Sequence, residues 1–560
     1  MSDRPRFTDG PTGYEFKPHE MPILPGSPAN PDHPTPRKIA YLVIGVFLGL
    51  VGGAQNGFLL ANTAALQGDM ALTPVEAGWI SVAFYATYTC MSMLLFRVRQ
   101  EAGVQPFVRY AMLGLVAANL VQLLEPGYSA ELAARAVAGI AASGLSALSI
   151  YYLMQGLPAA ARIGALILGI GLAQTAFPLA RAMSPYLLID GDISRVFQLQ
   201  FALSLVALGA VTVLRLPPGY RSKTFEILDL FSFTLFMAGV TALLAFLIQG
   251  RIQWWDTSWL GGALAMSILC LGSCFLIESN RRRPMLDTRW LSSRAILALA
   301  ITGATVRILV SEQSFGATGL FSALGYGNDQ LTGYYIVLAG ATIAGSILSL
   351  VRLDPKDLTR PILFAILVIA VAAFADTRTG IMSRPGDLYL TQAAIGFAAV
   401  FAMGPVMMEG MLRALAAGPA YVVSFIAVFS LSQTLGGLAG VSALSAFHTI
   451  RLKAHLIDAG STLTAANPLL ARELGQATAR YGATISDPAL QQQAAVARIA
   501  QAAAREAAVL AFNDVFFLIG SLACIAFVVV LAPWVMNRLR GRNPLSKELA
   551  LLETMRPGNK

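Results

Sequence analysis

Long apolar runs alternate along the chain with short polar segments that contain Gly, Pro and Arg. A transmembrane helix needs about 20 mostly apolar residues to cross a hydrocarbon core of about 30 Å. Runs of roughly that length lie at 39–65, 78–96, 109–125, 132–154, 163–183, 197–214, 228–249, 258–277, 295–323, 332–351, 361–376, 388–411, 421–447 and 512–534. The pattern therefore predicts an all-α, multi-pass membrane protein with fourteen transmembrane helices.

The composition agrees with a membrane protein and excludes other classes. Of the 560 residues, 56% are hydrophobic and only 13% are charged, whereas soluble domains carry about 25% charged residues. No G-x-x-x-x-G-K-[ST] sequence is present, so ATP-driven transport by this chain is not expected. Cys270 and Cys274 share a helix face, but no His or further Cys joins them, so we expect no metal site and no cofactor.

The distribution of Lys and Arg predicts the orientation in the membrane. With fourteen spans, both termini lie on the same side. If that side is the cytoplasm, its loops contain the cluster 281–283, while the short loops on the other face contain only Arg195, Arg251, Arg378 and Arg384. Cytoplasmic loops carry an excess of Lys and Arg, so we expect both termini inside. The formal net charge of +9 then follows from topology and needs no nucleic-acid partner.

Two loops indicate an internal duplication. The loop after the second span runs from Arg97 to Pro106, and the loop after the tenth runs from Arg352 to Pro361, with the same Arg-to-Pro spacing. Such an echo is typical of a duplicated bundle, with spans seven and eight inserted between the halves. The predicted organisation is a disordered cytoplasmic tail (1–38), a six-helix half (39–214), two inserted helices (228–277), a second six-helix half (295–534) and a cytoplasmic tail (535–560).

Residues 448–511 form a long polar segment between the last two spans and fall on the periplasmic side in this topology. Asn467-Pro468 is a helix-start signal and Gly482 a stop, which predicts a helix of about four turns. Asp487-Pro488 starts a second helix with no breaker before the last span. We therefore expect a helical hairpin on the outer face, with an apolar stripe that includes Val496, Ile499 and Ala503.

Several motifs along residues 39–540 resemble one transporter family. The region of spans seven and eight carries the matching residues Asp229, Gly250, Trp254, Trp255, Glu278, Pro284, Asp287 and Arg289. Further matches lie at 79–84, 135–139, 432–440 and 506–518. In these features the chain is similar to the major facilitator superfamily, and within it to the 14-helix drug:proton antiporters of the EmrB/QacA type, in particular their adaptor-coupled branch. The resemblance implies the major facilitator fold, an inner-membrane location and a periplasmic adaptor protein with an outer-membrane channel as partners.

The chain departs from the family pattern at three places. Gln55 occupies the position of the protonatable aspartate of span one. Gln100 stands at the aspartate of the loop after span two, and Arg181-Ala182 replaces two glycines of the span-five signature. These departures leave the scaffold recognisable but remove the acid that the family places in span one.

Charged residues inside the spans are candidates for proton coupling, because a charge at the bilayer centre costs about 2.5–3.5 kcal/mol on insertion scales. Glu312 and Arg307 lie in span nine, Arg135 near the start of span four and Glu409 near the inner end of span twelve. Span nine opens the second half, so Glu312 is predicted to replace the missing acid of span one. The alternatives are a carboxylate at the outer interface for Glu312, a snorkelling arginine for Arg135 and a surface pair with Arg413 for Glu409.

A second group of polar residues is expected to line the substrate cavity: Gln55, Asn62, Gln174 and Arg181. Neutral amides in membrane helices also hold helices together, and Arg181 lies near the outer end of its span, so a structural role remains open for each. Val496, Ile499 and Ala503 are the corresponding candidates for adaptor docking.

The leading functional prediction is secondary active export of small amphipathic or hydrophobic compounds by alternating access, coupled to protons across the bilayer. A binding site of this kind lies near the midplane between two helical repeats. One alternative is a dedicated exporter of a single metabolite such as a siderophore or a fatty acid. Another is a transport-dead scaffold or sensor, which Gln55 and Gln100 favour and the charges at Arg307 and Glu312 disfavour. No enzymatic activity is expected.

Overall fold

Fourteen helices among the described residues of the computed structural model are long and apolar enough to cross a membrane, as the sequence predicted. The structure describes residues 6–8, 17, 20, 22, 27–124, 127–158, 161–162, 164–188, 191–221, 225–462, 468–541 and 543–554. The first seven spans are α1 (Thr35–Ala61), α3 (Pro74–Ala102), α4 (Val104–Leu124), α5 (Tyr128–Gly156), α6 (Gly164–Leu187), α7 (Ser194–Val213) and α8 (Ile227–Gln253). The remaining seven are α9 (Ser258–Asn280), α11 with α12 (Arg294–Leu309 and Thr318–Leu324), α13 (Thr332–Val351), α14 (Thr359–Asp376), α15 (Tyr389–Ala417), α16 (Pro419–Thr462) and α18 (Pro488–Leu539).

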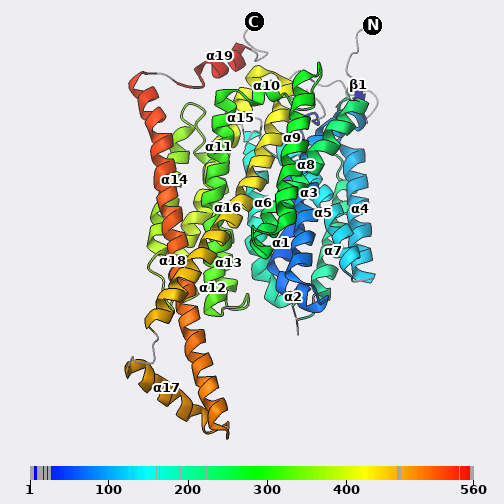
Figure 1. The fold of residues 1–560 in the computed structure, drawn as a ribbon. Helices are drawn as coiled ribbons and strands as arrows, with labels where there is room; N and C mark the ends of the chain where they lie inside the picture. The colour runs from blue at the N-terminus through cyan, green and yellow to red at the C-terminus, as the bar shows by residue number, and fades with distance from the viewer. Residues whose placement is uncertain are drawn as a thin grey trace.

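The helices form two six-helix bundles in which the same pairs meet. In the first bundle, α1 packs against α5 and α6, and α4 packs against α5 and α7. In the second, α11 packs against α15 and α16, and α14 packs against α15 and α18. Each bundle has its own apolar core. This repetition agrees with the duplication indicated by the two Arg-to-Pro loops (Figure 1).

The two bundles meet along two seams, α6 with α13 and α3 with α16. The inserted pair covers the second seam, because α8 packs against both α3 and α16, and α9 packs against α8. The described elements nearest the two termini, β1 (Arg6–Thr8) and α19 (Ser546–Thr554), lie at the same end of the bundle, as an even number of crossings requires (Figure 1).

An ion-pair cluster joins the inserted pair to α3 at the end of the bundle that holds the termini. Arg281 lies 2.8 Å from Asp229 and 2.8 Å from Glu278, and both carboxylates are almost fully buried. Arg97 of α3 donates to the carbonyl oxygen of Pro284 at 2.8 Å. Three of the residues that carry the family resemblance, Asp229, Glu278 and Pro284, therefore belong to one structural cluster.

The prediction of a disordered tail at 1–38 is wrong for the part nearest the membrane. Residues 27–30 are buried, and α1 begins already at Thr35. The side-chain amide of Gln155 donates to the Ala29 carbonyl oxygen at 2.9 Å and to Asn30 Oδ1 at 3.0 Å. A two-stranded antiparallel ribbon also pairs β1 (Arg6–Thr8) with β2 (Gly219–Arg221). These contacts join segments more than 100 residues apart, so local composition does not reveal them; most other residues before 27 lie outside the described part.

The segment 448–511 contains the predicted hairpin. Helix α17 spans Pro468–Tyr481 and α18 begins at Pro488, each at a proline used to predict it; the expected cap Asn467 lies outside the described residues. The hairpin projects beyond the other helices at the end opposite the termini (Figure 1). Within its apolar stripe, Val496 is 50% exposed, whereas Ile499 and Ala503 are partly buried.

Shorter helices complete the fold. They are α2 (Thr63–Asp69), α10 (Thr288–Leu291) and α19 (Ser546–Thr554).

Candidate functional site

The ninth span is not one continuous α-helix. A π-helical turn, Glu312–Ala317, separates α11 from α12. Single π-turns inside helices are rare and are frequent at functional sites. Glu312 is the first residue of this turn, and its side chain is fully buried. The alternative that Glu312 reaches the outer interface is therefore wrong.

Glu312 shares a hydrogen-bond donor with a second carboxylate. The amide nitrogen Nε2 of Gln392, on α15, donates to Glu312 Oε1 at 2.8 Å and to Asp376 Oδ2 at 2.8 Å. Tyr334 donates to the other side of the same amide, Gln392 Oε1, at 3.3 Å. One glutamine side chain therefore joins two acids that come from α14 and the π-turn.

No cation compensates this pair within the described part of the chain. The ion pairs found there include neither Glu312 nor Asp376, and Glu312 Oε2 has no hydrogen-bond partner there. Two negative charges in one buried site repel each other and lose hydration. The arrangement is therefore most stable with at least one proton on the pair, which is the chemistry that proton coupling needs.

The first half contains a buried polar network in the corresponding place. Arg135 forms an ion pair with Glu131 at 2.9 Å, and both side chains are at most 1% exposed. The Arg135 guanidinium also donates to the Gln55 carbonyl oxygen at 2.8 Å and to Gln200 Oε1 at 2.9 Å. Gln122 donates to Glu131 and accepts from Arg135. Arg135 is therefore buried and paired, which excludes the snorkelling alternative.

The two networks occupy related positions in the duplicated fold. Each joins the first, third and fourth helix of its own half: α1, α4 and α5 in the first, and the ninth span, α14 and α15 in the second. They differ in charge, because the first contains the pair Arg135–Glu131 and the second contains Glu312 and Asp376 without an arginine. Only the second therefore places two acids in one site without a counter-charge among the described residues.

Sequence reasoning missed Asp376 and Glu131. Asp376 is the last residue of its apolar run, and Glu131 lies one residue before the predicted start of span four. The available signal for Glu131 was its i,i+4 spacing to Arg135, which places both side chains on one helix face.

Arg307 lies between the two halves rather than beside Glu312. Its Nη1 donates to Gln174 Oε1, on α6 of the other half, at 3.3 Å. On the opposite side it packs on α16, where a Cβ added at Gly437 would lie 3.1 Å from Arg307 Nε. No ion pair of Arg307 occurs among the described residues, so Arg307 and Glu312 do not form a salt bridge.

The other cavity candidates fall into two groups. Arg181 faces the second half, because it donates to the Tyr335 hydroxyl at 2.8 Å and lies over the Tyr335 ring. Asn62 and Gln55 are buried within the first half. Asn62 donates to the Phe58 carbonyl oxygen at 2.8 Å, which is a structural contact. The Gln55 side-chain amide has no partner among the described residues.

Glu409, unlike Glu312 and Asp376, is partly exposed and forms an ion pair. It lies 2.8 Å from Arg413, which also reaches Glu548 at 3.5 Å. The Glu409 side chain is 19% exposed. The structure thus gives it the surface pairing that the sequence offered as the alternative, and it does not join the other candidates.

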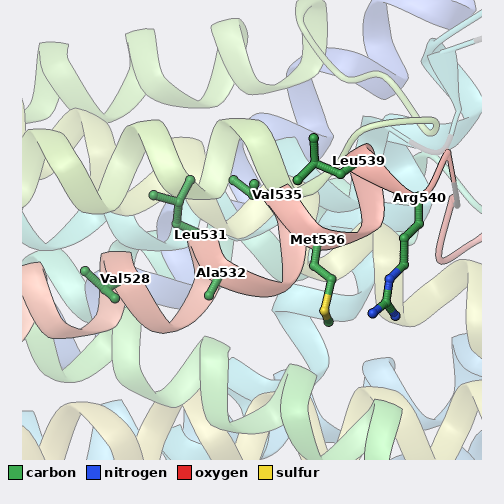
Figure 2. Close-up of a pocket in the computed structure, with 7 residues that line it drawn as sticks. All are labelled: Val528, Leu531, Ala532, Val535, Met536, Leu539 and Arg540. Carbon is green, nitrogen blue, oxygen red and sulfur yellow. The ribbon is translucent and has the colours of Figure 1, made fainter.

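A groove on the outside of the molecule is separate from these polar residues. It is lined by one face of α18: Val528, Leu531, Ala532, Val535, Met536, Leu539 and Arg540 (Figure 2). All but the last of these side chains are apolar, and Leu539 is 83% exposed. A surface of this kind suits lipid chains and offers no group for proton transfer.

The described residues contain no cluster of three or more His, Cys, Asp or Glu that could hold a metal ion.

Similarity to known proteins is found in the structure and not in the sequence. The sequence matches no known family profile, and no curated protein is detectably similar in sequence. Among solved structures, the human organic anion transporter MFSD10 (TETRAN) has a TM-score of 0.50 at 14% identity, covering 88% of this chain and 100% of that one. A bacterial homologue of the human drug peptide transporters PepT1 and PepT2 has a TM-score of 0.51 at 11% identity, covering 90% and 99%. The proton:xylose symporter XylE has a TM-score of 0.50 at 12% identity, covering 87% and 95%.

The chain has the major facilitator fold. This confirms the architecture that the resemblance implied, two six-helix halves with two inserted helices. At 11–14% identity the likeness concerns the arrangement of helices. The finer assignment to the EmrB/QacA type, and the compound that is moved, remain predictions.

Proposed function

We propose that the chain is a secondary active exporter of amphipathic or hydrophobic compounds that works by alternating access and is driven by protons. The observation that supports it most directly is the buried pair Glu312–Asp376, held by one amide and without a cation among the described residues. Buried ionisable groups in a membrane protein are costly and mark proton or substrate pathways.

The position of Glu312 suggests how protonation and transport are linked. Arg307, five residues earlier on the same span, contacts α6 of the first half through Gln174. When a proton leaves Glu312, a negative charge is added at the π-turn. The π-turn belongs to the same span as Arg307, so it links the Arg307–Gln174 contact to the core of the second half. We propose that this change shifts the relative stability of two arrangements of the halves, as alternating access requires.

Two alternatives differ in what they require. A dedicated exporter of one metabolite, such as a siderophore or a fatty acid, would use the same coupling site with a narrower substrate range. A transport-dead scaffold or sensor would have no need for a buried acid pair, so the cluster around Glu312 disfavours it.

The test is transport by the purified chain in proteoliposomes with an imposed pH gradient. A panel of fluorescent or labelled amphipathic compounds is added, and proton movement is followed with pyranine trapped inside. We expect at least one compound to elicit proton flux that protein-free liposomes do not show. Proton-driven export is contradicted if no compound elicits proton flux, or if compound uptake is the same with and without the pH gradient.

We further propose that the chain lies in an inner membrane and that the hairpin of α17 and α18 docks a periplasmic adaptor, through which an outer-membrane channel is reached. Its projection beyond the bundle, opposite the termini, supports this role (Figure 1). Val496 is the exposed member of the predicted docking stripe, while Ile499 and Ala503 are partly buried.

Alkaline phosphatase fusions test the orientation on which adaptor docking depends. The enzyme is active only outside the cytoplasm, so we expect high activity from a fusion between Tyr481 and Pro488, in the hairpin. A fusion after Lys547, in α19, is expected to be inactive. The reverse pattern would reject both the orientation and the adaptor.

A further inference from the structure

Arg307 carries a positive charge in the interior of the transmembrane bundle without a counter-charge. It lies two residues before the end of α11, and its side chain is only partly buried. Among the described residues its guanidinium donates a hydrogen bond to the neutral amide of Gln174. None of the ion pairs among the described residues includes it. A charge in this position is costly unless it is paired, so an anionic group from outside the chain would stabilise it.

A second polar group at the same place also lacks a partner. Both side-chain atoms of Gln433, its amide nitrogen and its oxygen, are buried and have no hydrogen-bond partner in the described part of the chain. Gln433 contacts the face of α11 one turn before Arg307, because a Cβ added at Gly303 would lie 3.3 Å from Gln433 Nε2. Buried amides without a hydrogen-bond partner are rare, and a polar group from a bound molecule or water is one way to satisfy them.

The surroundings of Arg307 are aromatic rather than acidic. Tyr85 and Tyr88 of α3 lie within electrostatic range of the guanidinium. The Tyr88 ring stacks on Phe84, with the ring centroids 5.7 Å apart. The two acids of the second half, Glu312 and Asp376, are instead held by Gln392. The region thus offers a planar cation, a free amide and ring faces.

We propose that Arg307 and Gln433 bind the acidic group of an amphipathic organic anion, and that such anions are the compound class this protein carries. A guanidinium matches the geometry of a carboxylate or sulfonate, with two parallel hydrogen bonds. Tyr85 and Tyr88 would contact the apolar body of the same molecule. This inference rests on the proposed export function and adds the charge of the substrate to it.

Equilibrium binding with three matched probes tests this assignment. Naphthalene-2-sulfonate, 2-naphthylmethanol and 2-naphthylmethylammonium have the same ring and differ in charge. Binding is measured to the full chain in lipid nanodiscs, with empty nanodiscs as the correction for partition into lipid. We expect the sulfonate to bind about tenfold more tightly than the other two, as a hydrogen-bonded charge pair provides. Equal or tighter binding of the ammonium probe would overturn the proposal.

Two variants locate the effect at Arg307. Arg307→Gln is expected to lower sulfonate affinity about tenfold or more. Gln174→Glu keeps the side-chain shape and places a carboxylate at the atom that now lies 3.3 Å from Arg307 Nη1, so it is expected to compete with the sulfonate and weaken its binding to a similar degree. The matched control is Arg195→Gln, an exposed arginine whose removal should leave the affinity unchanged.

The outcomes separate this proposal from the export proposal. If Arg307→Gln does not fold, Gln174→Glu still decides, because it retains Arg307; unchanged sulfonate affinity in Gln174→Glu would reject the anion site. No gradient is present in the binding measurement. A chain that binds the sulfonate selectively but moves no compound would therefore contradict export alone, and a chain that exports the ammonium probe as readily would contradict the anion assignment alone.

Discussion

Glu312→Gln is expected to abolish proton-driven transport while the protein still folds and still binds its substrate. The amide has the shape of the carboxyl group, and its oxygen can keep the 2.8 Å hydrogen bond from Gln392. It cannot release a proton, however. The second oxygen of Glu312 has no partner among the described residues, so its replacement by an NH₂ group breaks no contact seen there.

The measurement is compound-induced proton flux in proteoliposomes, compared with binding of the same compound without a gradient. We expect flux to fall to the level of protein-free liposomes and the dissociation constant to change little. Asp376→Asn should also lower the coupled rate, because Asp376 shares the Gln392 nitrogen that positions Glu312.

Glu409→Gln is the matched control for this variant. Glu409 is also a carboxylate on a transmembrane helix, but it is partly exposed and paired with Arg413 at 2.8 Å. We expect it to transport at close to the wild-type rate. Wild-type proton flux in Glu312→Gln would reject Glu312 as the coupling residue. If, in addition, Glu409→Gln lost its proton flux, the coupling site would lie at the inner end of α15.

The helices were predictable because their signals are local. A run of about 20 apolar residues has few alternatives to a membrane span, and all fourteen appear. The prolines at 468 and 488 likewise start α17 and α18 at the expected places. Length, apolarity and helix-start residues are properties of a short window, so one sequence suffices to find them.

The buried networks were only half predictable, because burial depends on neighbours from elsewhere in the chain. Glu312 and Arg135 were found as charges inside apolar runs. Asp376 and Glu131 lie at the edges of such runs, where a charged residue ordinarily meets water. Asp376 is nevertheless buried and accepts a hydrogen bond from Gln392, and no local pattern shows that contact.

Contacts between the halves were not predictable at all. Arg307 and Gln174 are 133 residues apart, and their hydrogen bond depends on how two bundles meet. The same holds for the ordered segment 27–30, which is buried against Gln155 from α5. Apolarity and proline content describe each segment separately, and these contacts arise only from packing.

Arg135→Leu is expected to destabilise the protein strongly, by about 3–5 kcal/mol, because it leaves Glu131 buried without its counter-charge. The ion pair is 2.9 Å long, and both side chains are at most 1% exposed. The guanidinium also holds the Gln55 carbonyl oxygen and Gln200, so its loss removes contacts between α5, α1 and α7. We expect a clearly lower melting temperature of the detergent-solubilised chain and less monodisperse protein on size exclusion.

The double variant Glu131→Gln with Arg135→Leu separates charge burial from packing. Removing both charges abolishes the uncompensated carboxylate, so the double variant should melt well above Arg135→Leu alone. Arg413→Gln, which breaks a partly exposed pair, should cost only about 0–1 kcal/mol. If Arg135→Leu melts like the wild type, the network is not structural. If the double variant regains stability but not proton flux, Arg135 acts in the transport cycle as well, and the charge difference between the two halves is then part of the mechanism.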